Sequence, residues 1–223
     1  MNNTPPARWK TIARIVSVFS AAGLLLASLT LPLWQMRLEA PQYRDEEALR
    51  VAVHPNAMRG DLPELAVLNQ YIGVHVPTEL SQFQWLPEAL IAGALLGIVA
   101  AFLPQTMRRR ALIIVVVALI SALGVAAVQA GFQMHDIGHH RDTHTVMLGV
   151  KDFTPPFLGS KKIAQFDVTS RFGTGAWLIG GALFLQLAAA WFSPRRKSFP
   201  ATSARALKNS SDKAAGQLSS AAV

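Results

Sequence analysis

The sequence predicts a membrane protein of the all-α class, a four-helix bundle that carries a small mixed α/β extracytoplasmic cap built from two loops. Three observations predict this fold. Of the 223 residues, 51% are hydrophobic, and they lie in blocks instead of being spread along the chain. Four blocks have about 18–22 residues each, enough to cross the hydrocarbon core of a bilayer. Two long, more polar segments separate the blocks and provide the cap.

The four expected spans lie at residues 12–33, 86–103, 111–130 and 174–192. The first block is long for a signal peptide, and no small-x-small cleavage site follows it, which favours an uncleaved anchor. Lys and Arg residues stand beside the start of the first span, in the 104–110 loop, and after the fourth span. The positive-inside rule places these three regions in the cytoplasm. Both terminal segments, 1–11 and 193–223, are therefore expected there, and the polar composition of the second predicts disorder.

Segments 34–85 and 131–173 are expected on the opposite side of the membrane. Alternating apolar and polar residues predict short strands at Met36–Tyr43 and Leu49–Val53, with a charged turn at 44–47 between them. Apolar residues at helical spacing predict a helix over Asp61–Tyr71, with a proline near its start. A further strand is predicted at Lys162–Ser170. These elements make the cap mixed α/β.

Composition excludes several kinds of site. The chain has no cysteine, so disulfides, thiolate zinc sites, thiolate iron–sulfur clusters and covalently attached haem are ruled out. Any bound metal must use imidazole, carboxylate, thioether or backbone oxygen ligands. No histidine lies near the middle of a span, so no haem is expected. The net charge of +8 comes from residues flanking apolar blocks, which indicates topology and not nucleic-acid binding. Since no catalytic constellation is visible, no enzymatic activity is expected.

A cluster of histidines and aspartates follows the third span. It contains His135, Asp136, His139, His140, Asp142 and His144. If the third helix continues into the cluster, His135 and His139 share one face, although Gly131 and Gly138 argue against such a continuation. Met134 and Met147 flank the cluster, while His54 and Met58 belong to the other outer segment. A metal site assembled from both segments is therefore feasible.

The chemistry of the cluster leaves several interpretations open. Imidazole, carboxylate and thioether groups together suit copper, zinc or iron. The same residues also fit a solvated loop, a contact with a partner, or histidines that titrate near neutral pH. A structural interpretation has Asp136 capping a turn, with Gly138 at a positive φ.

Several motifs, taken in order, are similar to those of one family. They are Leu31-Pro-Leu-Trp34, Leu38-Glu-Ala-Pro-Gln-Tyr43, Gly60-Asp-Leu62, Leu68-Asn-Gln-Tyr-Ile-Gly73, Asp136-Ile-Gly-His139 with Asp142, and Pro155-Pro-Phe-Leu-Gly-Ser-Lys161. The chain resembles the small four-span membrane proteins encoded among the accessory genes of copper-dependent respiratory enzymes, nitrous-oxide reductase in particular. The resemblance covers most of residues 30–180.

The resemblance implies a multi-pass accessory protein of the bacterial inner membrane, with copper as its metal and a larger membrane or periplasmic redox complex as its partner. It singles out Asp136, His139 and Asp142 as metal ligands, to which the cluster adds His135 and His144. The residues it assigns to structure are Tyr43, Asn69, Tyr71, Gly73, Gly138, Pro156 and Gly159. The chain departs from the family at Gln70 and Val74, where the family carries a histidine and a methionine.

Two functional hypotheses follow. In the first, the protein is a non-catalytic accessory factor whose extracytoplasmic cap assembles a respiratory copper enzyme or supplies copper to it. In the second, it is a structural small subunit of a larger membrane oxidoreductase and binds no metal itself. Membrane lipids are expected partners in both hypotheses, and nucleic acids in neither.

Overall fold

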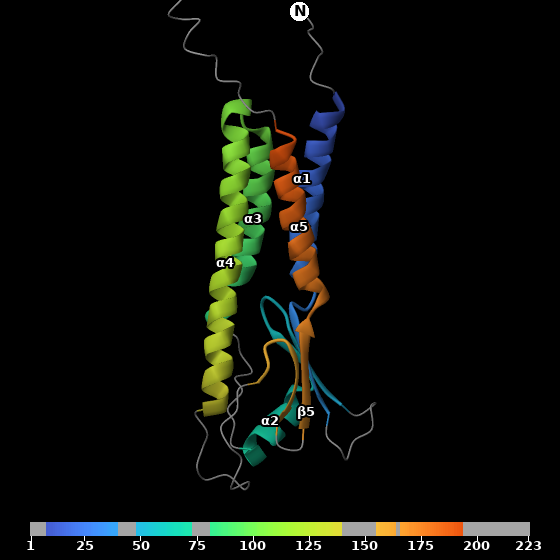
Figure 1. Ribbon diagram of the computed structural model, residues 1–223, viewed down its shortest axis with the longest axis vertical. Helices are drawn as coiled ribbons and strands as arrows, with labels where there is room; N and C mark the ends of the chain where they lie inside the picture. The colour runs from blue at the N-terminus through green and yellow to red at the C-terminus, as the bar shows by residue number, and fades with distance from the viewer. Residues whose placement is uncertain (1–7, 40–47, 73–80, 140–154, 164–165, 194–223) are drawn as a thin grey trace, which may run out of the picture. The chain divides into compact units, whose positions relative to one another are not determined.

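The structure is a computed structural model that describes residues 8–39, 48–72, 81–139, 155–163 and 166–193 (Figure 1). The chain is mostly helical, with four long apolar helices and a small antiparallel sheet, which confirms the predicted combination of elements. Tyr43, Gly73, Asp142 and His144, together with the charged turn at 44–47, lie outside the described residues.

Four helices form the bundle: α1 (Arg8–Ser28), α3 (Trp85–Phe102), α4 (Gln105–His139) and α5 (Thr174–Trp191). All four are long and apolar enough to cross a membrane. Helix α1 packs against α3 and α5, and α4 packs against the same two helices, so the four form a closed ring. Their buried faces are lined by residues such as Leu25, Leu90, Leu119 and Ala182.

Small residues allow the helices of the bundle to approach closely. A Cβ atom added to Gly93 of α3 would lie 2.5 Å from the side chain of Leu119 of α4. A Cβ added to Gly97 would lie 2.9 Å from Nε2 of the buried Gln186 on α5. Large apolar side chains such as Trp177 and Phe184 point outward and are more than 70% exposed. This arrangement, small residues inside and large apolar residues outside, suits a helix bundle surrounded by lipid.

The helix bounds differ from the expected spans at four places, the first of which is the start of α1 at Arg8 and not at residue 12. Helix α1 ends at Ser28, and the following Leu33 donates its backbone N–H to Val53 O (2.7 Å), so residues 31–33 belong to the connection with the sheet. The expected loop at 104–110 is nearly all helical, because α4 begins at Gln105. At its other end α4 continues past residue 130 to His139.

The extension of α4 has a packing cause. Ala126, Ala130, Gln133, Met134 and Ile137 recur three or four residues apart, and all of them line one cavity facing the sheet. A glycine in a helix costs about 1 kcal/mol relative to alanine, which such packing readily offsets at residue 131. Helix α4 has 35 residues and is therefore about 52 Å long, well beyond the roughly 30 Å of a hydrocarbon core.

The cap consists of the five strands, helix α2 (Leu62–Ile72) and the short 3-10 helix η2 (Ser81–Phe83). The strands are β1 (Trp34–Glu39), β2 (Leu49–Val53), β3 (Met58–Gly60), β4 (Gly159–Ile163) and β5 (Phe166–Phe172), in the sheet order β3-β2-β1-β5-β4. All neighbouring strands are antiparallel. Since β1 pairs with both β2 and β5, the two outer segments form one sheet.

The predicted strands at residues 36–43 and 49–53 and the predicted helix at 61–71 correspond to β1, β2 and α2. The single strand predicted at Lys162–Ser170 is wrong, because the chain forms a hairpin there: Ile163 pairs with Phe166. Ala164 and Gln165 are not the Asn, Asp or Gly residues that mark a two-residue hairpin turn, so the pattern carried no turn signal. Strand β3 was also not predicted.

The sheet has one apolar and one polar face, as the alternation of a half-buried sheet requires. Trp34, Met36 and Leu38 of β1 stand beside Val53, Val51 and Leu49 of β2 and beside Phe172, Ser170 and Val168 of β5. Residues of this face and residues of α4 line the same cavity. The alternate residues form the polar face.

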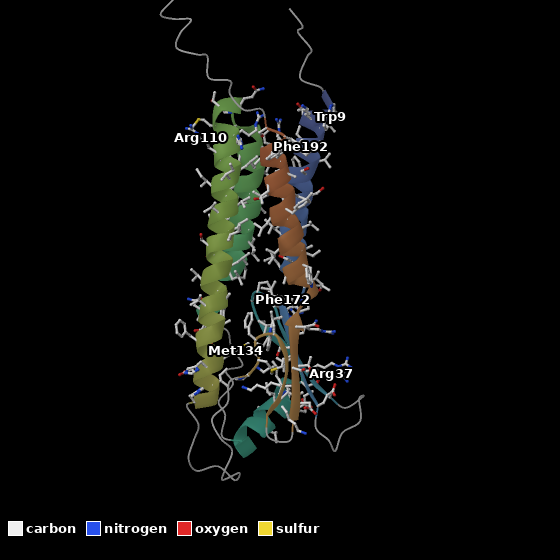
Figure 2. All side chains as sticks on the ribbon, in the orientation of Figure 1. Trp9, Arg37, Arg110, Met134, Phe172 and Phe192 are labelled. Atoms are coloured by element: carbon white, nitrogen blue, oxygen red, sulfur yellow. The ribbon has the colours of Figure 1, made fainter. Side chains whose placement is uncertain are left out.

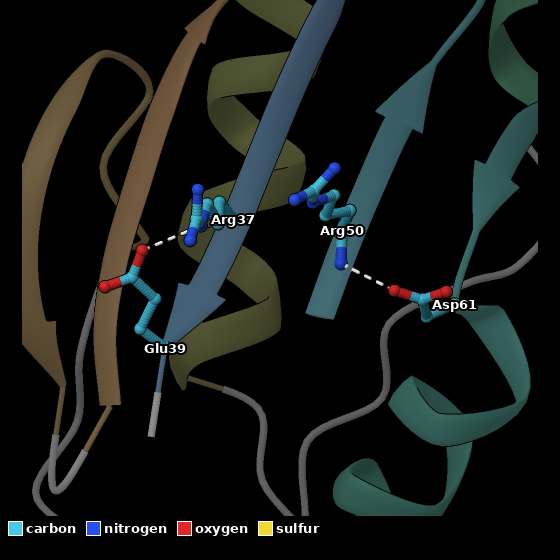
Figure 3. A network of polar contacts seen from close by, with 4 residues as sticks. All are labelled: Arg37, Glu39, Arg50 and Asp61. Carbon is cyan, nitrogen blue, oxygen red and sulfur yellow. Dashed lines mark hydrogen bonds and ion pairs between the residues drawn. The ribbon is translucent and has the colours of Figure 1, made fainter. Parts of the chain in front are cut away.

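The polar face carries two contacts shown in Figure 3. Arg37 Nε lies 2.7 Å from Glu39 Oε1, two residues along β1. The backbone N–H of Arg50 donates to Asp61 Oδ2 (2.9 Å), and the Asp61 N–H donates to Arg50 O (3.0 Å). Gly60, directly before Asp61, has φ 120°, and a Cβ atom there would lie 2.1 Å from Arg50 O. This tight connection from β3 to α2 therefore requires glycine.

Backbone hydrogen bonds join the bundle to the cap. Gly173 donates its N–H to Leu33 O (2.8 Å), and Gly175 donates to Pro32 O (2.9 Å). A Cβ atom at Gly173 would lie 2.0 Å from Pro32 O. The start of α5 therefore lies directly against the chain that leaves α1, and this close approach holds the sheet at one end of the bundle.

Candidate functional site

A large apolar cavity lies between the apolar face of the sheet and the bundle helices. Its volume is about 480 Å³. The bundle contributes aliphatic residues of α3, α4 and α5, and the cap contributes residues of β1, β2, β3 and β5 with the segment before β4. The cavity has the size and the mostly apolar lining of a small-molecule site, with few polar atoms that can provide specificity.

The aromatic side chain of Trp34 helps to shape this cavity. Its indole Nε1 donates a hydrogen bond to Phe157 O (2.7 Å), across more than a hundred residues of sequence. This bond fixes the segment of Pro155, Pro156 and Phe157, of which Pro155 and Phe157 line the cavity. The rings of Phe157 and Phe172 meet edge to face, with centroids 6.4 Å apart. Trp34 thus has a structural role in the cap.

Three methionines line the same cavity. Met36 comes from the central strand β1, Met58 from β3 and Met134 from the extended part of α4. Met36 pairs with Val51 and Met58 pairs with Val53, so both stand on the apolar face of the sheet. Met134 lines the cavity from α4, the helix on which Figure 2 labels it. The cavity therefore has thioether groups from three elements.

His54 is the ionisable residue of the cavity lining. It follows β2 directly and is only 8% exposed. Its backbone N–H donates to Ala57 O (2.8 Å) and closes the turn between β2 and β3. His54 stands at the start of this turn, and Met58 follows its end. The imidazole Nδ1 is buried and has no hydrogen-bond partner among the described residues. A ring nitrogen in this condition is available to a ligand or a metal ion.

The surroundings of His54 favour its neutral form. Burial lowers the pKa of the imidazole below its ordinary value of 6.5, and the positive charge of Arg59 lowers the pKa further. A hydrogen bond with the backbone of Ala52 acts in the opposite direction but is the smallest of the three effects. Because a neutral imidazole has a free lone pair, His54 is ready to act as a ligand near neutral pH.

The described members of the histidine–aspartate cluster, His135, Asp136 and His139, lie elsewhere, in the last turns of α4, whereas His140, Asp142 and His144 fall outside the described residues. His135 and His139 share one face, with ring centroids 3.9 Å apart and nearly parallel planes. His139 Nδ1 lies 2.8 Å from His135 O, and because a carbonyl only accepts, this nitrogen carries the proton. Both rings are exposed, as is Asp136. Because the two rings are stacked and nearly parallel, their in-plane lone pairs do not converge on one point in this arrangement.

The remaining predicted site residues are distributed over α4 and the cap. Gly138 lies within α4 and does not have a positive φ, which contradicts the turn proposed for Asp136 and Gly138, because the helix continues through both residues. Gly159 does have a positive φ, 95°, at the start of β4. Asn69 and Tyr71 lie in α2, but their side chains are not among those that the structure describes. Within the described part of the chain, no three His, Asp or Glu side chains come together as a metal site.

The sequence pointed to part of the cavity site. His54, Met58 and Met134 were noted as residues that two outer segments bring together, and the structure places all three around one cavity. Met36 was missed, although its position in the alternating pattern of β1 marks it as a residue of the apolar face. Met147 lies outside the described residues.

A comparison of the chain with known protein families finds no matching family, and a comparison with curated proteins finds no match either.

Proposed function

We propose that this protein is a multi-pass accessory protein of the bacterial inner membrane that handles copper(I) for a respiratory copper enzyme. The four helices of the bundle cross the membrane, both termini are cytoplasmic, and the cap faces the periplasm. One observation carries the proposal: three thioethers and a buried imidazole, whose Nδ1 has no hydrogen-bond partner among the described residues, line a single cavity between the cap and the bundle. The resemblance to accessory proteins of copper enzymes supports it.

The donor set matches the chemistry of copper(I). Thioether sulfur is a soft ligand that selects copper(I), and imidazole suits copper as well. An apolar environment favours a singly charged ion over a doubly charged one, because the desolvation cost rises steeply with charge. Met36, Met58, Met134 and His54 are therefore the residues that would hold copper as cargo. A His–Met set in the cavity also takes the place of the imidazole and thioether that the chain lacks at Gln70 and Val74.

Copper(I) binding to the full-length purified protein tests the proposal. Titration against a copper(I) chelator should give one bound ion per chain, with the affinity reduced at least tenfold by the combined substitutions Met36→Leu, Met58→Leu and Met134→Leu. Leucine has a similar volume, so the core should tolerate these changes. Met107→Leu is the matched control, because Met107 is 59% exposed at the far end of α4. An unchanged affinity in the triple variant refutes the cavity as the copper site.

The surface cluster provides the competing site. A variant with His139 and Asp142 both replaced by alanine should retain copper(I) binding if the cavity holds the ion. Loss of binding in this variant, with full binding in the methionine variant, would move the site to the histidine–aspartate cluster.

The structural-subunit hypothesis is tested separately. The membrane is extracted with a gentle detergent, and the sizes of the extracted particles are analysed. An accessory protein should separate from the copper enzyme under conditions in which that enzyme stays intact. A protein that always elutes as a stoichiometric part of an oxidoreductase complex, and that binds no copper, would favour the subunit role.

A further inference from the structure

A buried arginine lies at the opposite end of the bundle from the cap. This end, called here the turn end, contains the start of α1, the α3–α4 connection at residues 103–104, and the end of α5. Arg14 is only 8% exposed there. It lies on the same stripe of α1 as the buried residues Val18, Ala21 and Leu25, so its side chain belongs to the inner face of the helix. Its Nε atom is buried and has no hydrogen-bond partner among the described residues.

A second cation faces the same place. Arg108, in the first turns of α4, interacts electrostatically with Arg14. The Arg108 guanidinium is held by two hydrogen bonds from Nε and Nη2 to Leu103 O, at 3.0 and 2.7 Å. The Trp9 and Phe192 rings meet edge to face with centroids 6.0 Å apart, which closes this end between α1 and α5 (Figure 2).

The described residues at the turn end include no carboxylate that could neutralise these cations. No Asp or Glu occurs in residues 1–38, 89–135 or 168–211, the stretches that hold the three regions of the turn end. A buried cation without a counter-charge is costly, and two neighbouring cations add repulsion. An anion from outside the chain would remove both penalties.

We propose that Arg14 and Arg108 bind a phosphate group at the turn end, supplied by the headgroup of an anionic phospholipid. This inference rests on the proposed membrane location of the bundle but is independent of copper. Arg14 is five residues beyond Trp9, about 7.5 Å along the helix, which lies within reach of the headgroup layer for a guanidinium on a long side chain. Planar guanidinium groups suit phosphate oxygens because they donate two parallel hydrogen bonds.

The carbonyl groups at the C-terminal ends of α3 and α5 offer a different explanation. They carry partial negative charge and lie at the same end of the bundle, so they stabilise a nearby cation without any ligand. Stabilisation by these dipoles does not depend on the lipid present, and this difference separates the two explanations.

Thermal stability of the full-length protein in phosphate-free maltoside micelles provides the test. Added phosphatidylglycerol should raise the melting temperature by several degrees, because a ligand that binds only the folded state stabilises it. Diacylglycerol, which has the same acyl chains without phosphate, should give no shift. Inorganic phosphate shows whether a soluble anion can replace the lipid. If phosphate alone shifts the melting temperature as much as phosphatidylglycerol does, the lipid is not the source of the phosphate group.

Variants locate the site. Arg14→Gln should abolish the phosphatidylglycerol shift, and Arg108→Gln should reduce it at least by half. Arg110→Gln is the control, because Arg110 is exposed at the same end of the bundle. This variant removes one positive charge, as the two test variants do. If Arg14→Gln does not fold, Arg108→Gln decides alone. A full shift in Arg108→Gln, or an equal loss in Arg110→Gln, overturns the proposal in favour of diffuse surface charge or helix dipoles.

Discussion

Replacement of Gly173 by alanine should separate the cap from the bundle at its tightest contact. Gly173 has φ −80° and ψ 170°, an extended conformation open to any residue, so the whole cost comes from contact and not from backbone strain. The added Cβ would stand 2.0 Å from Pro32 O, whereas real Cβ atoms essentially never come within 3.0 Å. The start of α5 must therefore move by roughly 1 Å or more.

The magnitude follows from what that movement breaks. The hydrogen bonds from Gly173 N to Leu33 O and from Gly175 N to Pro32 O each contribute about 1 kcal/mol. Overpacking adds about 1–3 kcal/mol. The free energy of unfolding should fall by about 3–5 kcal/mol, which corresponds to a melting temperature about 10 °C lower for a chain of this size.

The assay is thermal unfolding in detergent micelles, followed by tryptophan fluorescence, with Gly124→Ala as the control. A Cβ at Gly124 meets nothing within 4 Å, and alanine is the better helix former, so this variant should be as stable as the wild type or slightly more stable. If Gly173→Ala melts within 2 °C of the wild type, the close backbone approach between the bundle and the cap is not real.

Two further predictions concern the cavity. Since the pKa of His54 is lowered in the folded protein, its contribution to stability is present above the unfolded value of about 6.5 and is lost as the pH falls through the folded pKa. Between pH 7 and pH 5, denaturant titrations should therefore show a larger loss of unfolding free energy in the wild type than in His54→Gln. Equal losses in the two proteins would refute the buried neutral imidazole. Trp34→Phe keeps an aromatic ring but removes the hydrogen bond to Phe157 O, so the free energy of unfolding should fall by about 1 kcal/mol, with faster hydrogen exchange at the amides of residues 157 and 158. Unchanged exchange there would show that the bond does not hold the segment.

The strand predictions illustrate how far sequence patterns reach. Leu49–Val53 was predicted with the bounds of β2, because alternation over five residues is a local property. The hairpin of β4 and β5 was read as one strand, because the pairing of Ile163 with Phe166 is not marked by a turn residue. The three-residue strand β3 is too short for any periodicity and exists because it pairs with β2.

The candidate site shows the same division. The histidine–aspartate cluster drew attention because its residues are adjacent in sequence, yet the described members form an exposed helical turn with stacked rings. The cavity residues Met36, His54, Met58 and Met134 are scattered over a hundred residues and become neighbours of one cavity only through the sheet and the extended α4. Adjacency along the chain and proximity in space are different properties.

The sequence by itself determined the four apolar helices, their number and approximate extent, because block hydrophobicity and helix length are local quantities. It also restricted the side chains that could bind a soft metal, since a chain without cysteine offers only methionine and histidine for that purpose. The tertiary structure alone decided that β1 joins the two outer segments into one sheet, and that α4 extends past residue 130 to cover its apolar face. The physical reason is that an apolar face is buried by a segment distant in the sequence, and the local sequence of the face does not show which segment that is.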